Sequence, residues 1–198
     1  MKKLFYTTAM VLAAALTFTS CVDWQKRQEQ QETKPVEKRV EVNYTIDCTQ
    51  DVIDALDLVI TYKDKGGINS VDTLRDTHWT KTVVHDMVPA KAGLIWSVTP
   101  KPGSSINKDT IDLDAKYAME YNGRMITRCA YLFYYPNFPV SRLETLCDLI
   151  NLQRANSLSK DDIFECNIIM PYGENENRPI DAEDQDLKIG YCNWDDDL

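Results

Sequence analysis

The chain has 198 residues, a formal net charge of −9, and 43% hydrophobic and 27% charged residues. This length suffices for one hydrophobic core with an appendage, and the composition is that of an ordinary globular protein. A negative surface repels phosphate backbones and anionic lipid headgroups, so we expect no nucleic-acid partner. Attachment to a membrane would have to come from covalently bound lipid.

The first 20 residues have the layout of a bacterial export signal. Two lysines precede an apolar stretch over residues 4–16, which is too short for a stable membrane span. Cys21 follows, and the segment 1–20 resembles the signal peptide of a lipoprotein, which is cut before a cysteine whose thiol is acylated. Those signals usually carry leucine three residues before the cysteine, where this chain has Phe18. We predict lipidation at Cys21, with a plain secretory signal or an uncleaved anchor as alternatives.

Residues 22–38 read VDWQKRQEQQETKPVEK and hold almost nothing apolar after Trp24. Such a composition cannot bury a core, so we predict that the lipidated cysteine and a disordered tether occupy residues 21–39. Stable anchoring takes more than one acyl chain, such as palmitate. The expected location is therefore the cell envelope, on the outer membrane, with the leaflet left open.

Hydrophobic residues alternate with polar ones along most of residues 40–135, which predicts short strands joined by turns. The expected strands cover about residues 40–48, 56–62, 69–74, 79–84, 92–98, 111–121 and 125–135. Asn122-Gly123 predicts a tight hairpin between the last two, because both residues tolerate positive φ. This pattern indicates a mainly β fold, an antiparallel immunoglobulin-like β-sandwich. The sequence lacks the Cys…Trp…Cys spacing of true immunoglobulin domains, so the topology stays open.

We predict that residues 136–198 form a helical extension followed by an acidic tail. Ser141-Arg142-Leu143-Glu144 is a capping box, so a helix is expected over about residues 142–156. Its apolar stripe, which we expect to pack on or beside the final hairpin, consists of Leu143, Leu146, Cys147 and Ile150. The apolar run 163–170 is a further candidate strand, and the residues after about 174 are mostly polar and acidic.

The six cysteines are Cys21, Cys48, Cys129, Cys147, Cys166 and Cys192. The absence of any CxxC motif from the sequence argues against a zinc site and against thioredoxin-like chemistry. Export makes the compartment permissive for disulfides, and Cys166 with Cys192 is the expected pair, because both lie in a tail with few other means of fixing itself. Whether any bridge forms stays open, and Cys129 and Cys147 are expected to be buried small hydrophobes.

No sequence motif predicts a catalytic residue, a bound metal or a cofactor. The two histidines, His78 and His85, flank one strand and point to opposite faces, so they cannot share a metal without a bend. Carboxylates cluster at residues 181–186 and 195–197, but the first cluster lacks the glycine and the distal glutamate of an EF-hand loop. We interpret these clusters as a solvated acidic tail, with calcium binding as the alternative.

Aromatic residues crowd the segment 131–139, which reads YLFYYPNFP. Burial in the core beneath the helix explains this segment better than a sugar-stacking platform does. If a glycan site exists, Tyr135 and Phe138 at the strand exit are its expected members.

Several features of the chain together resemble a known class of proteins. They are the signal with Cys21, the charged tether, the segments Val42-Asn43-Tyr44-Thr45 and Leu58-Val59-Ile60-Thr61-Tyr62-Lys63-Asp64, and the Gly-Gly turn and Trp79 that follow. Over about residues 1–134 the chain resembles the small uncharacterised envelope lipoproteins of Bacteroidales-type bacteria, which carry a β-sandwich domain. The resemblance implies an envelope lipoprotein without an assigned activity. Such bacteria also O-glycosylate Asp-Thr-aliphatic triplets, which implies candidate sites at Thr73 and Thr110.

These observations predict a lipid-anchored, non-enzymatic binding or accessory module of the cell envelope. Its expected partners are the membrane, through the lipid, and an envelope protein or a glycan. A glycan-binding or calcium-dependent adhesion component is the alternative, and a hydrolase whose acid groups are not recognisable in the sequence comes third.

Overall fold

The computed structural model describes residues 34–102, 106–157, 166–173 and 186–192. The predicted signal peptide, the lipidation site Cys21 and most of the predicted tether lie outside these residues. The chain divides into two units, Met1–Lys34 and Pro35–Leu198, and the second contains every element described below. In the described part of the chain, no helix is both long enough and apolar enough to cross a membrane.

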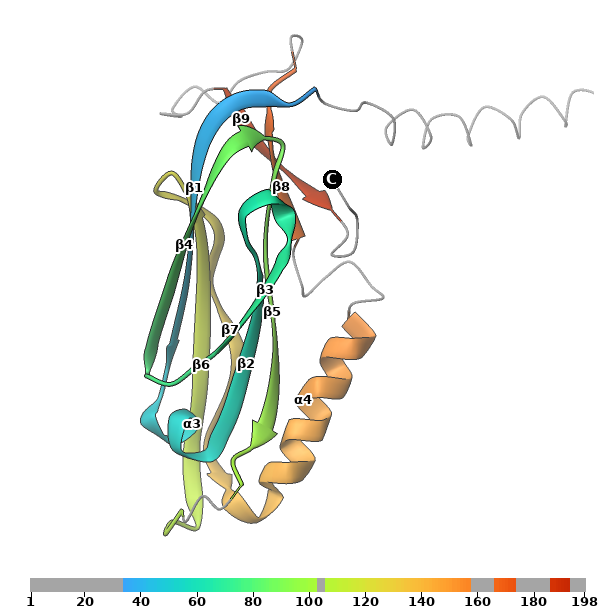
Figure 1. The fold of residues 1–198 in the computed structure, drawn as a ribbon. Helices are drawn as coiled ribbons and strands as arrows, with labels where there is room; N and C mark the ends of the chain where they lie inside the picture. Colours follow the sequence, from blue (N-terminus) through green and yellow to red (C-terminus); the bar gives the residue numbers. More distant parts are fainter. Residues whose placement is uncertain (1–33, 103–105, 158–165, 174–185, 193–198) are drawn as a thin grey trace, which may run out of the picture. The chain divides into compact units, whose positions relative to one another are not determined.

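Two antiparallel sheets form the second unit (Figure 1). The first sheet has the order β4 (His78–Val88), β1 (Val36–Cys48), β6 (Thr110–Tyr121) and β7 (Arg124–Pro139). The second has the order β3 (Asn69–Thr73), β2 (Leu56–Lys63), β5 (Ala90–Pro100), β8 (Cys166–Pro171) and β9 (Leu187–Cys192). The helical elements are α3 (Gln50–Ala55), η1 (Lys65–Gly67), η2 (Val140–Arg142) and α4 (Leu143–Ser157). The prediction of a mainly β, antiparallel sandwich with a C-terminal helix is confirmed.

The first five strands are paired as in an immunoglobulin-like sandwich. β1 pairs with β4 in one sheet, while β2 pairs with β5 in the other. The same interlocking relates strands B and E to strands C and F of immunoglobulin domains. The continuation differs, because β6 and β7 return to the first sheet and β8 occupies the place beside β5.

The alternating pattern creates the core between the sheets. On β1 the side chains of Val40, Val42, Tyr44 and Ile46 are 0% exposed, while the residues between them are partly exposed. β6 repeats this pattern from Ile111 to Tyr121. Burying each large apolar side chain contributes about 1.5–3 kcal/mol, so these strands supply much of the stability.

The Tyr44 hydroxyl connects the two sheets through the core. It donates a hydrogen bond to the Lys63 carbonyl on β2 at 2.8 Å and accepts one from the Gly93 amide on β5 at 3.3 Å. Burial raises the pKa of this hydroxyl well above its usual range, so it stays a neutral donor. One side chain of the first sheet therefore fixes the position of two strands of the second.

β1 begins at Val36, four residues before the predicted start, so the predicted tether does not extend to residue 39. Val36 and Glu37 pair with Val88 and Met87 of β4. Backbone hydrogen bonds hold this stretch in the sheet although its side chains are mostly exposed. The alternation of apolar and polar residues reports only burial, so it does not detect the first residues of β1.

Irregular pairing in β7 changes which residues face the core. Ala115 pairs with Phe133 and Lys116 pairs with Tyr131, so Leu132 is an extra residue on β7, a β-bulge. Leu132 and Phe133 are both buried, whereas Tyr131 and Tyr134 are each 55% exposed. The residues of this strand therefore do not alternate simply between core and solvent.

The predicted helix exists as α4, and its stripe Leu143, Leu146, Cys147 and Ile150 is buried. It packs mainly along β5 of the second sheet and less against β7 of the final hairpin, on or beside which it is predicted to lie (Figure 1). The Asn151 side chain accepts a hydrogen bond from the Val98 amide at 3.1 Å and donates one to the Val98 carbonyl at 2.7 Å. Because β8 pairs only with Ala90–Gly93, the rest of that edge of β5 needs another partner, and α4 provides it.

The C-terminal segment contributes two strands to the sandwich. β8 overlaps the predicted apolar run 163–170, whereas the prediction of an acidic tail is wrong for Leu187–Cys192, which form β9. β9 is short, and of its residues Leu187 is buried against β8. So short a strand gives only a weak alternation in the sequence.

The two hydrogen bonds of the Tyr44 hydroxyl, which we call the Tyr44 bridge, predict a change in stability that does not depend on burial of the ring. Tyr44→Phe keeps the buried ring but leaves the Lys63 carbonyl and the Gly93 amide without the hydroxyl, so we expect a loss of about 1–3 kcal/mol in the free energy of unfolding. Urea denaturation measures this loss. Tyr134→Phe, at an exposed ring, is the matched control, with an expected change within about 0.5 kcal/mol. Equal effects of the two substitutions would contradict the bridge.

Candidate functional site

The predicted glycan-contact residues Tyr135 and Phe138 lie against the hydrophobic core. Both are half-buried, and their rings meet edge to face with centroids 5.9 Å apart. A stacking platform needs an exposed ring face, so the core interpretation of these two residues fits the structure better than the platform does.

The exposed aromatic surface lies instead on the outer side of the first sheet. The rings of Tyr131 and Tyr134 lie 5.3 Å apart, centroid to centroid, with their planes inclined at 55°. Directly across the ladder stand Lys116 and Asp114 of β6. We call these four residues, Asp114, Lys116, Tyr131 and Tyr134, the tyrosine patch.

Charged residues of β6 lie beside the Tyr131 ring and opposite Tyr134 in the ladder. The Lys116 ammonium lies 4.9 Å from the centroid of the Tyr131 ring and 3.5 Å from the Asp114 carboxylate. Asp114 and Tyr131 together raise the pKa of Lys116, which keeps its charge at neutral pH. The patch therefore combines two aromatic faces with a positive and a negative hydrogen-bonding group, the usual means of holding a polar ligand that has an apolar face.

A second candidate is a cavity of about 540 Å³ at the end of the sandwich where α3 begins. Its lining residues are Asp51, Ile53, Asp54, Lys101, Ile106, Asn107, Lys108 and Ile111. We call this region the acidic end. Its isoleucines provide apolar walls, and its carboxylates, ammonium groups and amide provide polar ones.

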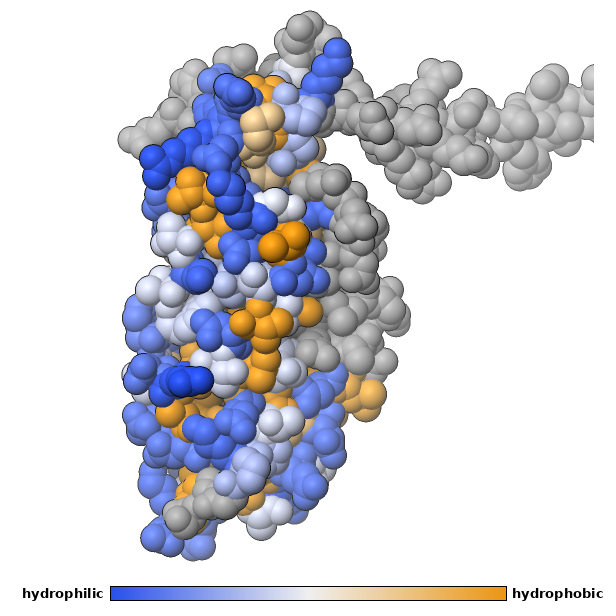
Figure 2. Space-filling model, in the orientation of Figure 1, coloured by the Kyte–Doolittle hydropathy of each residue, from blue (hydrophilic) through white to orange (hydrophobic). Residues whose placement is uncertain are grey.

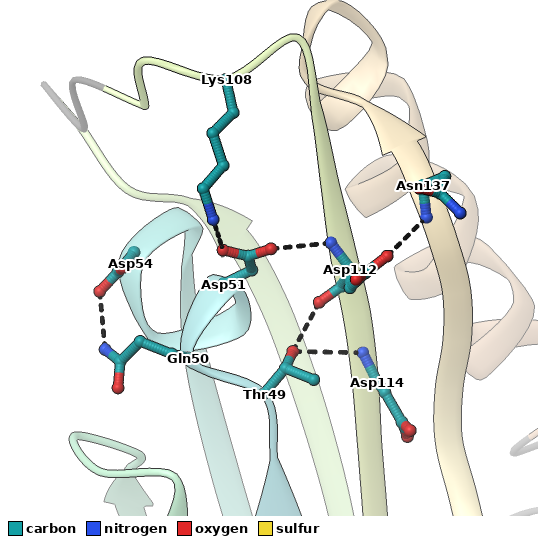
Figure 3. Close-up of polar contacts among 8 residues, drawn as sticks. All are labelled: Thr49, Gln50, Asp51, Asp54, Lys108, Asp112, Asp114 and Asn137. Carbon is teal, nitrogen blue, oxygen red and sulfur yellow. Dashed lines mark hydrogen bonds and ion pairs between the residues drawn. The ribbon is translucent and has the colours of Figure 1, made fainter.

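The carboxylates beside this cavity are already engaged in hydrogen bonds (Figure 3). Asp51 accepts hydrogen bonds from Lys108 Nζ at 2.6 Å and from the Asp112 amide at 2.9 Å. Asp112 in turn accepts one from the Asn137 amide at 2.7 Å, and the Thr49 hydroxyl donates to the Asp112 carbonyl at 2.6 Å. This network joins α3 to the beginning of β6 and the end of β7.

Lys108 and the Asp112 amide lower the pKa of Asp51. A general acid at neutral pH needs a raised pKa, so Asp51 is poorly suited to that role. The network is one of hydrogen-bonded groups that join α3 to the neighbouring strands.

The two histidines occupy different environments. His78 lies exposed, with Nδ1 2.7 Å from the Asp47 carboxylate. His85 is buried, its Nε2 has no hydrogen-bond partner among the residues that the structure describes, and burial lowers its pKa. It borders a small cavity of about 250 Å³ beside η1. Within the described ranges, no group of three or more His, Cys, Asp or Glu side chains is arranged to hold a metal ion.

The carboxylate clusters of the C-terminal segment lie outside the described residues, apart from Asp186. The Asp186 carboxylate pairs with Lys38 at 3.6 Å, and its carbonyl accepts a hydrogen bond from the Tyr172 amide at 2.9 Å. These contacts hold the start of β9 and have no bearing on calcium binding by the rest of the cluster.

The structure brings the predicted cysteine pair together, with Cys166 directly opposite Cys192 in the β8–β9 ladder. Both are thiols, as are Cys48 and Cys147. Cys147 is buried, as predicted, and burial raises the pKa of its thiol to about 11. The side chain of Cys129 and the site Cys21 lie outside what the structure describes.

The two predicted O-glycosylation sites differ in accessibility. Thr110 is exposed at the first position of β6, whereas Thr73 is half-buried at the end of β3. The aliphatic residues that complete the two triplets, Leu74 and Ile111, are both buried. Thr110 is therefore the better placed of the two for modification.

Exposed hydrophobic side chains are dispersed on the face seen in Figure 2, where they form separate spots among hydrophilic ones. Ile68 and Val71, next to or on the edge strand β3, are 64% and 66% exposed.

Sequence reasoning missed the tyrosine patch and the acidic end. The segment 131–139 carried the signal for the first, but choosing the exposed rings required the position of the bulge at Leu132. For the second, Asp51 and Lys108 are 57 residues apart in sequence, and no spacing rule relates them.

No family model matches the chain, and no curated protein sequence matches it. The site must therefore be interpreted from its own geometry.

The acidic-end network predicts a pH-dependent stability. Asp51→Asn should lower the free energy of unfolding by about 1 kcal/mol at pH 7, because the ionised acceptor of Lys108 is lost. The pKa of Asp51 in the folded state lies below its unfolded value of about 3.9, so this contribution is complete above that pH and disappears as the pH falls through the folded-state pKa. Urea denaturation of both proteins at neutral and at strongly acidic pH measures the difference.

Asp76→Asn, at an exposed bend, is the control for this comparison. A loss at Asp51 that stays constant down to the lowest pH would show that the carboxylate charge is not the stabilising element.

Proposed function

We propose that this protein is a non-enzymatic binding or accessory module of the cell envelope, held to the outer membrane by lipid on Cys21. The sequence of the first 21 residues supports the anchor, and the tether provides reach from a membrane surface. The observation that carries the binding role is the tyrosine patch, in which two neighbouring rings, each 55% exposed, face away from the core.

The exposure of the Tyr131 and Tyr134 rings, which is unfavourable in the absence of a ligand, supports a binding role. Burying an aromatic side chain is favourable, so two adjacent exposed rings on a sheet that has a well-filled core represent apolar surface available to a ligand. The pair lies on a strand that is hydrogen-bonded to β6 on both sides of the bulge, so its geometry is set before a ligand arrives. Binding to a pre-organised surface loses less conformational entropy.

A glycan is the second, more specific candidate ligand. The C–H face of a sugar ring packs on aromatic faces, while charged side chains accept and donate hydrogen bonds to its hydroxyl groups. The tyrosine patch holds both elements within one pair of strands, with Lys116 beside Tyr131 and Asp114 opposite Tyr134. A hydrolase is less favoured, since Asp51 and Asp112 at the acidic end accept hydrogen bonds that hold neighbouring elements together. Calcium-dependent adhesion remains the alternative that the C-terminal carboxylate clusters suggest.

The anchor is tested by changing the acylated atom. Cys21→Ser removes the thiol that would carry the lipid, so we expect the protein to move from the membrane fraction to the soluble fraction after cell lysis. Cys48→Ser is the matched control and should leave the partition unchanged. Membrane association that persists in Cys21→Ser would contradict lipid anchoring.

The ligand class is tested on a glycan array with the purified chain. We expect bound glycans, and in the double variant Tyr131→Ala, Tyr134→Ala a loss of affinity of at least about tenfold, because stacking on each ring contributes about 1 kcal/mol or more. Met125→Ala, an exposed position on the same strand, is the control and should bind as the wild type does.

Parallel arrays with calcium and with a chelator decide whether binding needs the metal. Wild-type binding that survives the double substitution would move the site away from the tyrosine patch. An array on which the wild type binds nothing would remove the glycan candidate and leave an envelope protein as the expected partner.

A further inference from the structure

The β8–β9 hairpin holds a pair of cysteines in direct register. Cys166 faces Cys192 across an antiparallel ladder. Opposite residues in such a ladder have Cα atoms about 4.5–5.5 Å apart, within the range of about 4.4–6.8 Å that a disulfide spans. The two side chains also interact by a hydrogen bond, so the sulfur atoms lie on the same side of the hairpin. The backbone therefore needs no large movement to join them.

The surroundings of the pair distinguish the two sulfur atoms. Cys166 is 1% exposed, whereas Cys192 is half-buried and so the more accessible of the two. Two buried lysines, Lys63 and Lys91, place positive charge near Cys192 and favour its thiolate. The neighbouring Cys166 thiol and burial together raise the pKa of Cys192, and the two lysines act against this rise. Because the thiolate is the reactive species in thiol–disulfide exchange, the lysines assist a reaction that burial slows.

We propose that Cys166 and Cys192 form a cross-strand disulfide when the protein meets a disulfide oxidant, either a small molecule such as oxidised glutathione or a protein disulfide. The accessible Cys192 thiolate attacks one sulfur of the oxidant and forms a mixed disulfide, and the other sulfur leaves as a thiolate. Cys166 gives up its proton and attacks the Cys192 sulfur, and the second half of the oxidant leaves as a thiol. The protein loses two electrons and two protons, and the oxidant becomes two thiols.

The bond would fasten a part of the sandwich that few other contacts hold. β8 pairs with β5 only over Ala90–Gly93, and β9 pairs only with β8 among the described strands. Closing the chain between residues 166 and 192 lowers the entropy of the unfolded state, which for a domain of this size corresponds to a rise in Tm of about 5–10 °C. This inference does not depend on the proposed binding function.

The test uses the full chain, equilibrated with oxidised glutathione, then denatured and alkylated with iodoacetamide without reduction. Peptide mass spectrometry should find Cys166 and Cys192 joined in one cross-linked species that is two hydrogen atoms lighter than the separate peptides. Cys147→Ser is the control and should form the same species in the same yield. Alkylation of both Cys166 and Cys192, or a link from either to another cysteine, would overturn the proposal.

Two further measurements examine the order of attack and the effect on stability. In Cys166→Ser, Cys192 should accumulate the glutathione adduct, and in Cys192→Ser, Cys166 should react at least about tenfold more slowly because it is buried. Faster reaction at Cys166 would overturn the proposed order. Dithiothreitol should lower the Tm of the oxidised wild type by about 5–10 °C and leave the double variant Cys166→Ser, Cys192→Ser unchanged. The peptide map needs no variant, so a variant that fails to fold does not weaken the test.

Discussion

The Tyr44 hydroxyl is the interaction on which the arrangement of the two sheets depends. A polar group in the middle of an apolar core costs free energy unless it is hydrogen-bonded, so the hydroxyl, the Lys63 carbonyl and the Gly93 amide must stay in reach of one another. This requirement fixes β1 relative to β2 and β5, and apolar packing alone does so less strictly. It also acts beside the cysteine pair, because Gly93 is the ladder partner of Cys166.

The proposed recognition surface, the tyrosine patch, lies away from this fixed centre. A well-packed sandwich leaves its inner faces unavailable, so ligands must use outer faces, edges and loop ends. β7 is an edge strand in the described sheet order, and its bulge turns Tyr131 and Tyr134 outward while Leu132 and Phe133 fill the core. The same irregularity that disrupts the ladder also discourages edge-to-edge pairing with another chain. The same strand can therefore contribute Leu132 and Phe133 to the core and present Tyr131 and Tyr134 to the proposed ligand.

Local patterns in the sequence predicted those parts of the fold that depend on burial alone. The alternation of Val40, Val42, Tyr44 and Ile46 marks a strand with one buried face, and Asn122-Gly123 marks a turn whose two residues have positive φ. The remaining features depend on pairing between distant segments. The position of α4 follows from the open edge of β5 at Val98, and the exposure of Tyr131 follows from its register with Lys116. Cys166 and Cys192 were paired because of their place in the tail, whereas the structure relates them through strand register.

Native-state hydrogen exchange tests most directly whether the sandwich is a rigid centre with recognition elements at its margin. We predict that amides of β1, β2 and the Leu56–Tyr62 partners on β5 exchange only through global unfolding, since they lie around the Tyr44 bridge. Amides of β7 beyond its bulge, and of β9, should exchange faster through local opening. Exchange in β1 as fast as in β7 would contradict the account, because the proposed centre would then be no more stable than the edge it is meant to support.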